Sequence, residues 1–445
     1  MRSSPYTWLF GIYLRARARL GGDTRYALYR QLLREQWLPA EEIKRLQATR
    51  LRTLIAHTLV KSPFYSKRDS DLLPLVSKGF SLDDLANFPL LTRSDLQNHF
   101  TEILCPDCAP LWPDSSGGST GHPVNFWHDS RSRTFADACE LLFLSWVNVA
   151  VGDRTAVFWG ADRDFHEMSL KERLMRRVKR VKLLNSFDMS ADRLDDFLRQ
   201  VEAFRPKSVT GYSSSLHYAA RHINATKKYS IRPKVIRSSA EMLYDFQRQE
   251  IERAFGAPVF NFYGSREVSH LAAECSAHNG LHVFASGRIV EVVAEDGSRL
   301  PPGETGYLAV TDLSSYAFPF IRYLNGDMGA ISSEKCPCGR GYPLLSSIAG
   351  RSSDIICVNG RHIHGEYFTH LFYHQPQVRQ FQVVQEAADK LVIRIVASGE
   401  SFDERCVLEP VRELVGENIA LDIELVDAIS PTESGKYRFT INRMA

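Results

Sequence analysis

Short apolar runs alternate with amphipathic segments between residues 150 and 265. The apolar runs are TAVFWG, SVTGY, KVIRSS and PVFNFYG, and the segments between them include RLDDFLRQVEAF, SLHYAARHINA and DFQRQEIERAF. The first set has the length and composition of buried strands, and the second carries apolar residues at helical spacing. Strands that alternate with helices form β-α-β units, whose strands are parallel. This region therefore predicts a largely parallel sheet with helices packed on it.

The regions on either side of this one have different hydrophobic and turn patterns. Residues 24–60 have helical periodicity, and Thr92 or Ser94 is expected near the N-cap of a helix that follows. From about residue 281, hairpin turns at Asp296-Gly297 and Pro302-Gly303 indicate antiparallel strands.

A chain of 445 residues is too long for one core, and the segment after Gly350 has its own strands and a helix over 403–416. The predicted fold is α/β. A large domain, residues 1–350, has mixed and parallel sheets flanked by helices and an antiparallel subdomain. A small mobile α+β domain spans residues 351–445.

Charge and cysteine content exclude several classes of protein. The chain has 55 basic and 52 acidic residues, a net charge of +3, which gives no indication of a nucleic-acid partner. The apolar stretch YTWLFGIYL is too short to span a bilayer and has no signal-peptide cleavage site. Eight cysteines in so long a chain do not form a disulfide framework. We expect a cytoplasmic monomer or homodimer without a transmembrane segment.

The segment SSGGSTGHPV, residues 115–124, exposes an unusual amount of bare backbone. Its glycines leave N–H groups unscreened, and its hydroxyl side chains add donors, so that the loop can surround an anion such as a phosphate chain. The residues concerned are Ser116, Gly117, Gly118, Ser119, Thr120 and Gly121. No Lys-Ser or Lys-Thr follows the last glycine, which excludes a Walker A loop. The loop alone does not separate a phosphate site from a flexible surface loop.

Four later segments follow in a defined order: FNFYGSREVS (260–269), IRYLNGDMGAI (321–331), IAGRSSDIICVNG (348–360) and SPTESGKYRF (430–439). Together with the glycine loop they resemble the core motifs of the adenylate-forming superfamily of acyl-CoA synthetases, luciferases and peptide-synthetase adenylation domains. The segments SVTGYSSSL, ECSAHNGLHV and CPCGRGYPLLSSIAGRSSDII are most similar to the phenylacetate–CoA ligase branch, including its capsule-biosynthesis relatives. The resemblance spans roughly residues 45 to 440.

This resemblance implies that ATP and Mg²⁺ are used and assigns roles to particular residues. The glycine loop would hold the β- and γ-phosphates, and Glu267 would bind Mg²⁺, a hard cation that prefers carboxylate oxygen. Lys436, a compact charge on a flexible stem, would catalyse adenylation. The other nucleotide contacts would be Ser239, Ala240, Glu241, Tyr263, Gly264, Arg266, Asp327 and Arg351. Among these, Tyr263 would stack on adenine and Asp327 would bind the ribose hydroxyls.

The chain departs from the superfamily pattern at three positions. Val124 stands where many members have lysine, and Arg266 stands where a small hydroxyl residue is common. The Arg266 guanidinium is suited to clamp a phosphate. Ser353 stands where the hinge motif usually has aspartate, which leaves rotation of the small domain plausible but its pivot open.

The cysteines suggest a separate metal site. Cys336 and Cys338 frame a proline, and Cys275 lies close to His278 and His282 in the sequence. Three thiolates and one imidazole satisfy tetrahedral zinc, with His282 preferred over His278; reduced, unligated thiols are the alternative. Cys105 and Cys108 form a C-x-x-C pair just before the glycine loop, a competing knuckle that is interpreted as structural. Similar cysteines in relatives resembling this chain support zinc.

The sequence predicts an AMP-forming carboxylate ligase, which would convert a carboxylate to acyl-AMP and transfer the acyl group. CoA is the expected acceptor, and an amine of an amino acid or amino sugar is the first alternative. A nucleotidyltransferase that leaves AMP on its substrate is the second. Trp159, Tyr212 and Phe262 could line an aromatic-sized acyl pocket. The basic stretch KERLMRRVKRVKLL, residues 171–184, is expected to be a helix, and it is either a solvated face or a contact for a phosphate-rich acceptor such as CoA.

Overall fold

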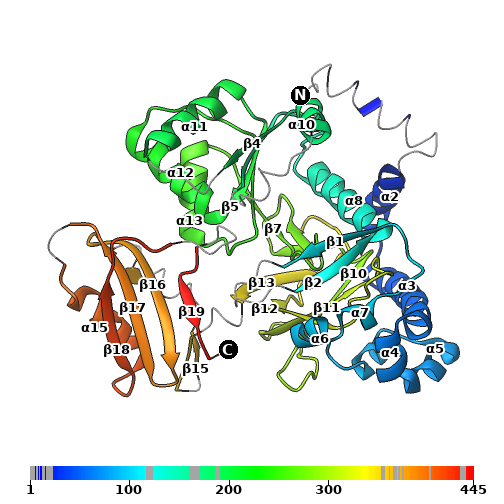
Figure 1. Cartoon of the computed structure of the whole chain (residues 1–445). Helices are drawn as coiled ribbons and strands as arrows, with labels where there is room; N and C mark the ends of the chain where they lie inside the picture. Colours follow the sequence, from blue (N-terminus) through cyan, green and yellow to red (C-terminus); the bar gives the residue numbers. More distant parts are fainter. Residues whose placement is uncertain are drawn as a thin grey trace. The chain divides into compact units, whose positions relative to one another are not determined.

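The computed structural model describes residues 6, 9, 11, 12, 16, 24–116, 124–159, 170–185, 191–351, 356–359, 361–363, 368, 371–372, 375–399, 402–430 and 437–444 (Figure 1). The backbone forms two compact units. The large unit comprises residues 1–325 and 329–347, and the small unit comprises residues 326–328 and 348–445.

The large unit begins with the helices that the periodicity of residues 24–60 predicted. They are α2 (Thr24–Glu35), α3 (Ala40–Lys61), α4 (Pro63–Arg68), α5 (Leu73–Gly79), α6 (Arg93–Asn98) and α7 (Phe100–Ile103). Thr92, not Ser94, is the N-cap of α6. Its hydroxyl accepts from Asp95 N at 3.1 Å, and the Asp95 carboxylate accepts from Thr92 N at 2.7 Å. This reciprocal pair satisfies two backbone donors at the start of the helix. None of the described helices is long and apolar enough to cross a bilayer.

The predicted parallel sheet is confirmed. Its strands are β3 (Thr155–Trp159), β4 (Val181–Asn185), β5 (Ser208–Tyr212), β6 (Val235–Ser239) and β7 (Val259–Tyr263), in the spatial order β4-β3-β5-β6-β7. Each neighbouring pair in this series is parallel. The helices between them are α10 (Leu170–Lys179), α11 (Ala191–Phe204), α12 (Ser213–Thr226) and α13 (Asp245–Phe255). The helix expected over residues 171–184 is wrong in its last part, because residues 181–185 form β4, which pairs with β3. Figure 1 shows α11, α12 and α13 grouped beside the strands, and buried Phe158, Val209, Leu198, Leu216 and Ile236 form the core between them.

The antiparallel strands continue this same sheet. Beyond β7 the order is β8 (Ala272–Glu274), β9 (Leu281–Val283), β13 (Leu344–Arg351), β12 (Tyr323–Ile331), β11 (Gly306–Asp312) and β10 (Arg288–Val293), which gives eleven strands in all. β10 and β11 pair antiparallel, and Gly297 in the predicted turn between them has φ +82°. That left-handed conformation suits glycine.

A hairpin outside this sheet carries the glycine loop. β1 (Leu111–Ser115) and β2 (Asn125–Asp129) pair antiparallel, with Ser115 opposite Asn125. The following helix, α8 (Ser130–Trp146), starts with a capping box in which Asp129 accepts from Ser132 N at 2.7 Å. The glycine-rich residues 117–123 connect β1 to β2 in the sequence and lie outside the described residues.

The small unit is an α+β module, as predicted. A sheet of order β18-β17-β16-β19 contains β16 (Val378–Ala387), β17 (Lys390–Ala397), β18 (Ala420–Leu425) and β19 (Thr440–Asn442). The helix α15 (Arg405–Val415) buries Val407 and Val411 against Val383 and Ile393 of this sheet. The short pair β14 (Ile356–Val358) and β15 (Arg361–Ile363) completes the unit. A domain boundary after residue 350 and movement of residues 351–445 stay predictions.

Candidate functional site

Hydrogen bonds close the base of the glycine loop. Ser116 N donates to Val124 O at 2.9 Å, and Val124 N donates to Ser116 Oγ at 3.0 Å. Arg93 Nη2 is a second donor to Ser116 Oγ, at 3.3 Å. Ser116 and Val124 are both buried, so packing as well as hydrogen bonding holds the two residues that flank the loop. Gly117, Gly118, Ser119, Thr120 and Gly121 lie outside the described residues, and their contact with phosphate stays a prediction.

Ser239 and Tyr263 end two adjacent parallel strands. Ser239 is the last residue of β6 and Tyr263 the last of β7, and Ser239 Oγ donates to Phe262 O at 2.9 Å. The Tyr263 hydroxyl accepts from Asn325 Nδ2 at 2.7 Å. Ligands of open α/β sheets bind at the carboxyl ends of the strands. This edge therefore has the position that a nucleotide site requires.

Backbone conformation and helix capping fix the two residues after β6, Ala240 and Glu241. Ala240 has φ +69°, a left-handed conformation that costs a non-glycine residue roughly 1–3 kcal/mol. The Glu241 carboxylate accepts from Ser214 N at 2.8 Å, at the start of α12. The carboxylate of Glu241 therefore caps a helix. Gly264, after β7, has no room for a side chain, because a Cβ there would lie 2.8 Å from His270 N.

Arg266 and Glu267 follow β7 and differ in their partners. Arg266 Nη1 lies 3.3 Å from Asp114 Oδ1, so its guanidinium is paired with a carboxylate. Burial raises the pKa of Asp114, but hydrogen bonds from His128 and Ser115 and the charge of Arg266 outweigh it and hold that pKa below its usual range. Glu267 is 7% exposed, and its carboxylate has no hydrogen bond or ion pair in the part of the chain that the structure describes. A carboxylate without a counter-charge among the described residues is suited to bind a hard cation such as Mg²⁺.

In the small unit, Asp327 and Arg351 face each other. Arg351 Nε lies 3.8 Å from Asp327 Oδ1, and the carboxylate is 15% exposed against 38% for the arginine side chain. Lys436 and Ser353 lie outside the described residues, so the assignment of a catalytic lysine and of a hinge stay predictions.

The expected aromatic pocket is only partly described. Tyr212 and Phe262 are both buried, and the side chain of Trp159 is outside the described part. The Phe262 ring packs edge-on against Phe143, with centroids 4.9 Å apart. Phe262 therefore contributes to the core of the large unit.

Sequence reasoning missed a charged cluster beside Phe262. Arg237 of β6 pairs with Glu140 of α8 and lies over the Phe262 ring, and His270 Nε2 is 3.4 Å from the same carboxylate. Burial disfavours the charged form of Glu140, but Arg237 and His270 outweigh it and lower the pKa of Glu140 to about 2. Arg237 Nε and His270 Nδ1 are buried and have no hydrogen-bond partner among the residues that the structure describes. The signal available in the sequence was the arginine inside the apolar strand VIRSS.

Four side chains converge at a second place in the large unit. The ligand atoms of Cys275, His282, Cys336 and Cys338 all lie within 4.8 Å of one another. Cys275 Sγ is 3.6 Å from Cys336 Sγ, and Cys338 Sγ is 3.2 Å from His282 Nε2. Three of the four residues are buried. The donor set of three sulfurs and one imidazole nitrogen fits tetrahedral zinc.

Neighbouring groups orient these ligands. His282 Nδ1 lies 3.3 Å from Tyr342 O, and donation to this oxygen leaves Nε2 free to bind a metal. Ala277 N donates to Cys275 Sγ and Arg340 N to Cys338 Sγ, both at 3.5 Å. Histidine 278 is outside the cluster, because His278 Nδ1 lies 3.1 Å from Glu274 Oε2. Cys105 and Cys108 belong to no group of three or more potential ligands among the described residues.

The loop after Cys338 packs tightly on the N-terminal helices, which yields a stability prediction. A Cβ at Gly341 would lie 1.8 Å from Leu38 O. This oxygen belongs to the backbone between α2 and α3, so it can move only if that connection moves. We expect Gly341→Ala to lower the free energy of unfolding of the large unit by about 1–3 kcal/mol or more. Denaturant unfolding checks this. Gly399→Ala is the matched control, because nothing lies within 4 Å of its Cβ position. Equal stability of the two variants would contradict the packing described here.

Comparisons with known proteins agree with the predicted fold and with the resemblance stated from the sequence. Residues 355–443 match the family model described as the CapK C-terminal domain. The phenylacetate-coenzyme A ligase of Thermus thermophilus is 24% identical over 82% of this chain and 84% of that protein. Protein CapK of Staphylococcus aureus is 24% identical over 91% of this chain and 92% of its own length.

The solved structures include a close match in fold. The structure of 2-hydroxyisobutyryl-CoA ligase in the postadenylation state, in complex with R3-HIB-AMP, has a TM-score of 0.74, 21% identity and 92% coverage of both chains. The curated relatives and this neighbour support the expectation that the chain is an AMP-forming ligase. The chain is thus similar over most of its length to phenylacetate-coenzyme A ligases and to CapK, and its resemblance to the phenylacetate–CoA ligase-like branch of the adenylate-forming superfamily is confirmed.

Proposed function

We propose that this protein activates a carboxylic acid with ATP, releases pyrophosphate, and transfers the acyl group from acyl-AMP to the thiol of CoA. The observation that carries the proposal is the set of nucleotide-motif residues at the carboxyl edge of the parallel strands, Ser239 and Tyr263 among them. The names of the relatives support it, because they include phenylacetate-coenzyme A ligases from several bacteria.

The chain's own residues account for nucleotide binding in this proposal. Tyr263 presents a ring at the end of β7, with its hydroxyl held by Asn325. Ser116 anchors the glycine loop, whose N–H and hydroxyl groups would bind the β- and γ-phosphates. Asp327 would accept hydrogen bonds from the ribose hydroxyls, with Arg351 beside it. Arg266 would exchange its contact with Asp114 for a phosphate oxygen.

Glu267 is suited to hold Mg²⁺, because its buried carboxylate lacks a cationic partner in the described part of the chain. The ion would supply neutralisation of charge on the phosphates. In the same way, Cys275, His282, Cys336 and Cys338 would hold a structural Zn²⁺, which would brace strands β8, β9 and the loop before β13.

The test is ATP–pyrophosphate exchange with a panel of aromatic and aliphatic carboxylates, followed by addition of CoA or of amines. Carboxylate-dependent exchange is expected, and CoA should consume the acyl-AMP. Consumption by an amine alone would identify an acyl-amide ligase. AMP retained on the product would identify a nucleotidyltransferase. Absence of exchange with every acid would overturn the proposal.

Removal of the Glu267 charge should impair the first half-reaction. We expect Glu267→Gln to lower the rate of pyrophosphate exchange by about 10²-fold and to raise the Mg²⁺ concentration needed for half-maximal rate, because a metal ligand stabilises charge on the transferring phosphoryl. The measurement is exchange across a magnesium titration. Glu304→Gln, at an exposed site of the same unit, is the control. An unchanged magnesium dependence would show that another residue binds the ion.

A further inference from the structure

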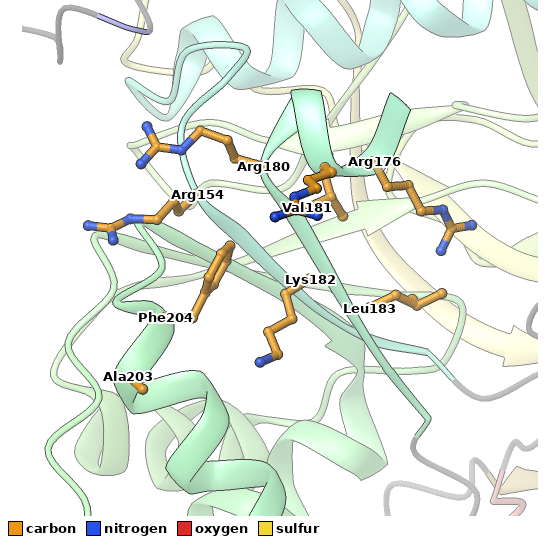
Figure 2. A pocket seen from close by; sticks show the side chains of 9 residues that line it. Arg154, Arg176, Arg180, Val181, Lys182, Leu183, Ala203 and Phe204 are labelled. Atoms are coloured by element: carbon orange, nitrogen blue, oxygen red, sulfur yellow. The ribbon is translucent and has the colours of Figure 1, made fainter. Parts of the chain in front are cut away.

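A basic cavity lies outside the proposed site. It has a volume of about 680 Å³ and opens beside α10, β4 and the end of α11. Figure 2 shows Arg154, Arg180 and Lys182 arranged around the ring of Phe204. Its cationic lining residues are Arg154, Arg176, Arg177, Arg180 and Lys182.

The five cations of the cavity are not neutralised by the described part of the chain. None of them forms an ion pair with a carboxylate among the described residues. Like charges gathered around one cavity repel each other and attract anions. The cavity therefore has the electrostatic character of a site for phosphate groups.

The cavity is at the wrong edge of the sheet to serve the nucleotide. Arg154 immediately precedes β3, and Lys182 is the second residue of β4. Both residues therefore lie at the amino ends of parallel strands. Ser239 and Tyr263 mark the carboxyl ends of β6 and β7. Since these strands run in one direction, the two edges are separated by the strand length, about 15 Å. The described cations of α10 and β4 therefore lie at the opposite edge of the sheet from the nucleotide-motif residues.

Exposed apolar side chains border the same cations. Leu174, Met175 and Val178 are 62%, 42% and 37% exposed, and their spacing puts them on one face of α10. The helical residues Tyr6, Leu9 and Ile12 are also exposed. These six account for nearly half of the thirteen large apolar side chains exposed in the described part of the chain.

Two contacts join Tyr6 to α10 and to the residue that follows it. The Tyr6 hydroxyl donates to Val178 O, and the Arg180 guanidinium lies 5.1 Å from the centroid of the Tyr6 ring. Tyr6 therefore connects the apolar face of α10 to the cationic cavity. Apolar and cationic groups side by side on one exposed surface are the features of a helix that lies in a membrane interface.

We propose that this surface, formed by Tyr6, α10 and the basic cavity, docks on an anionic phospholipid bilayer. The cavity cations would bind headgroup phosphates, while Leu174, Met175 and Val178 enter the boundary of the acyl chains. The protein then works as a peripheral membrane protein with the carboxyl edge of the parallel strands facing away from the lipid.

The experiment is flotation of the whole protein with vesicles of phosphatidylcholine, with or without about one third phosphatidylglycerol. Binding is expected only to the anionic vesicles, and it should weaken as salt screens the charges. Arg176→Gln/Arg177→Gln/Lys182→Gln should lower the partition coefficient on the order of 100-fold, because each interfacial cation contributes about fivefold. Leu174→Ser/Val178→Ser should also lower binding while keeping its salt dependence.

Two controls separate this surface from general electrostatics and from a soluble ligand. Lys44→Gln/Arg45→Gln/Lys67→Gln removes the same charge from exposed positions of α3 and α4 and should leave binding unchanged. Inorganic phosphate or pyrophosphate at millimolar concentration should not release the protein from the vesicles. The proposal is overturned if the protein ignores anionic vesicles, if the two triple variants lose binding equally, or if free phosphate alone fills the cavity and releases the protein. Thermal unfolding of each variant confirms that the fold is intact.

Discussion

Replacement of Lys436 by alanine is expected to slow acyl-AMP formation by about 10²- to 10³-fold, with the KM for ATP nearly unchanged. The resemblance assigns this lysine to the adenylation step, in which its ammonium would stabilise charge as pyrophosphate leaves. It follows Gly435 in a segment rich in Pro, Thr and Ser, where a role in a packed core is implausible. A group that acts mainly in the transition state lowers kcat and kcat/KM together when it is removed.

The two half-reactions distinguish this role from a general defect. The Lys436→Ala protein should still transfer the acyl group from synthetic acyl-AMP, because transfer does not need this side chain. Lys390→Ala is the matched control. It removes a half-exposed lysine of the same unit, whose ion pair with Asp422, at 2.8 Å, is open to solvent and contributes little to stability. Near-normal acyl-AMP formation by Lys436→Ala would show that the C-terminal motif is wrongly assigned and that another group carries the nucleotide chemistry.

Replacement of Cys336 and Cys338 by serine should destabilise the large unit by several kcal/mol and abolish zinc binding. The reason is the geometry of the four ligands, which converge within 4.8 Å and draw on β8, β9 and the loop before β13. A metal that binds only the folded state adds its binding free energy to stability. Elemental analysis of protein purified without chelator should give about one zinc per chain, and denaturant unfolding should give the stability loss.

A cysteine-to-serine substitution away from the four ligands is the control for the loss of a thiol as such. Cys357→Ser changes an exposed cysteine of the small unit and should leave both zinc content and stability unchanged. The zinc hypothesis is wrong if the wild-type protein contains no zinc and the double variant is as stable as the wild type.

Much of the architecture could be predicted from local patterns. The alternation over residues 150–265 predicts four of the five parallel strands, β3, β5, β6 and β7, and helices between them, because hydrophobic periodicity is a local property of the sequence. The fifth strand, β4, lies where the basic pattern predicts the end of a helix. The motif order predicts the resemblance to adenylate-forming ligases, which the comparisons confirm. The C-x-C spacing of Cys336 and Cys338 likewise predicts a metal knuckle, although zinc itself stays a prediction.

Partners distant in the sequence could not be predicted in this way. The sequence left His278 and His282 almost equivalent as ligands, and the strand pairing decides between them. β9 places His282 Nε2 beside Cys338, 56 residues later, while His278 contacts Glu274. Arg237, Glu140 and His270 form one cluster only because β6, α8 and the segment after β7 pack together.

The sequence by itself determined the class of fold, the order of the motifs and the types of residue available for chemistry. Tertiary structure alone decided that the antiparallel strands extend the parallel sheet, that Glu267 is buried without a cationic partner in the described part, and that the basic segment lies at the amino ends of the strands. The physical reason is the distance along the sequence over which each effect acts. Periodicity and turn chemistry act over a few residues, whereas burial and charge pairing depend on which distant segments the closed core brings into contact.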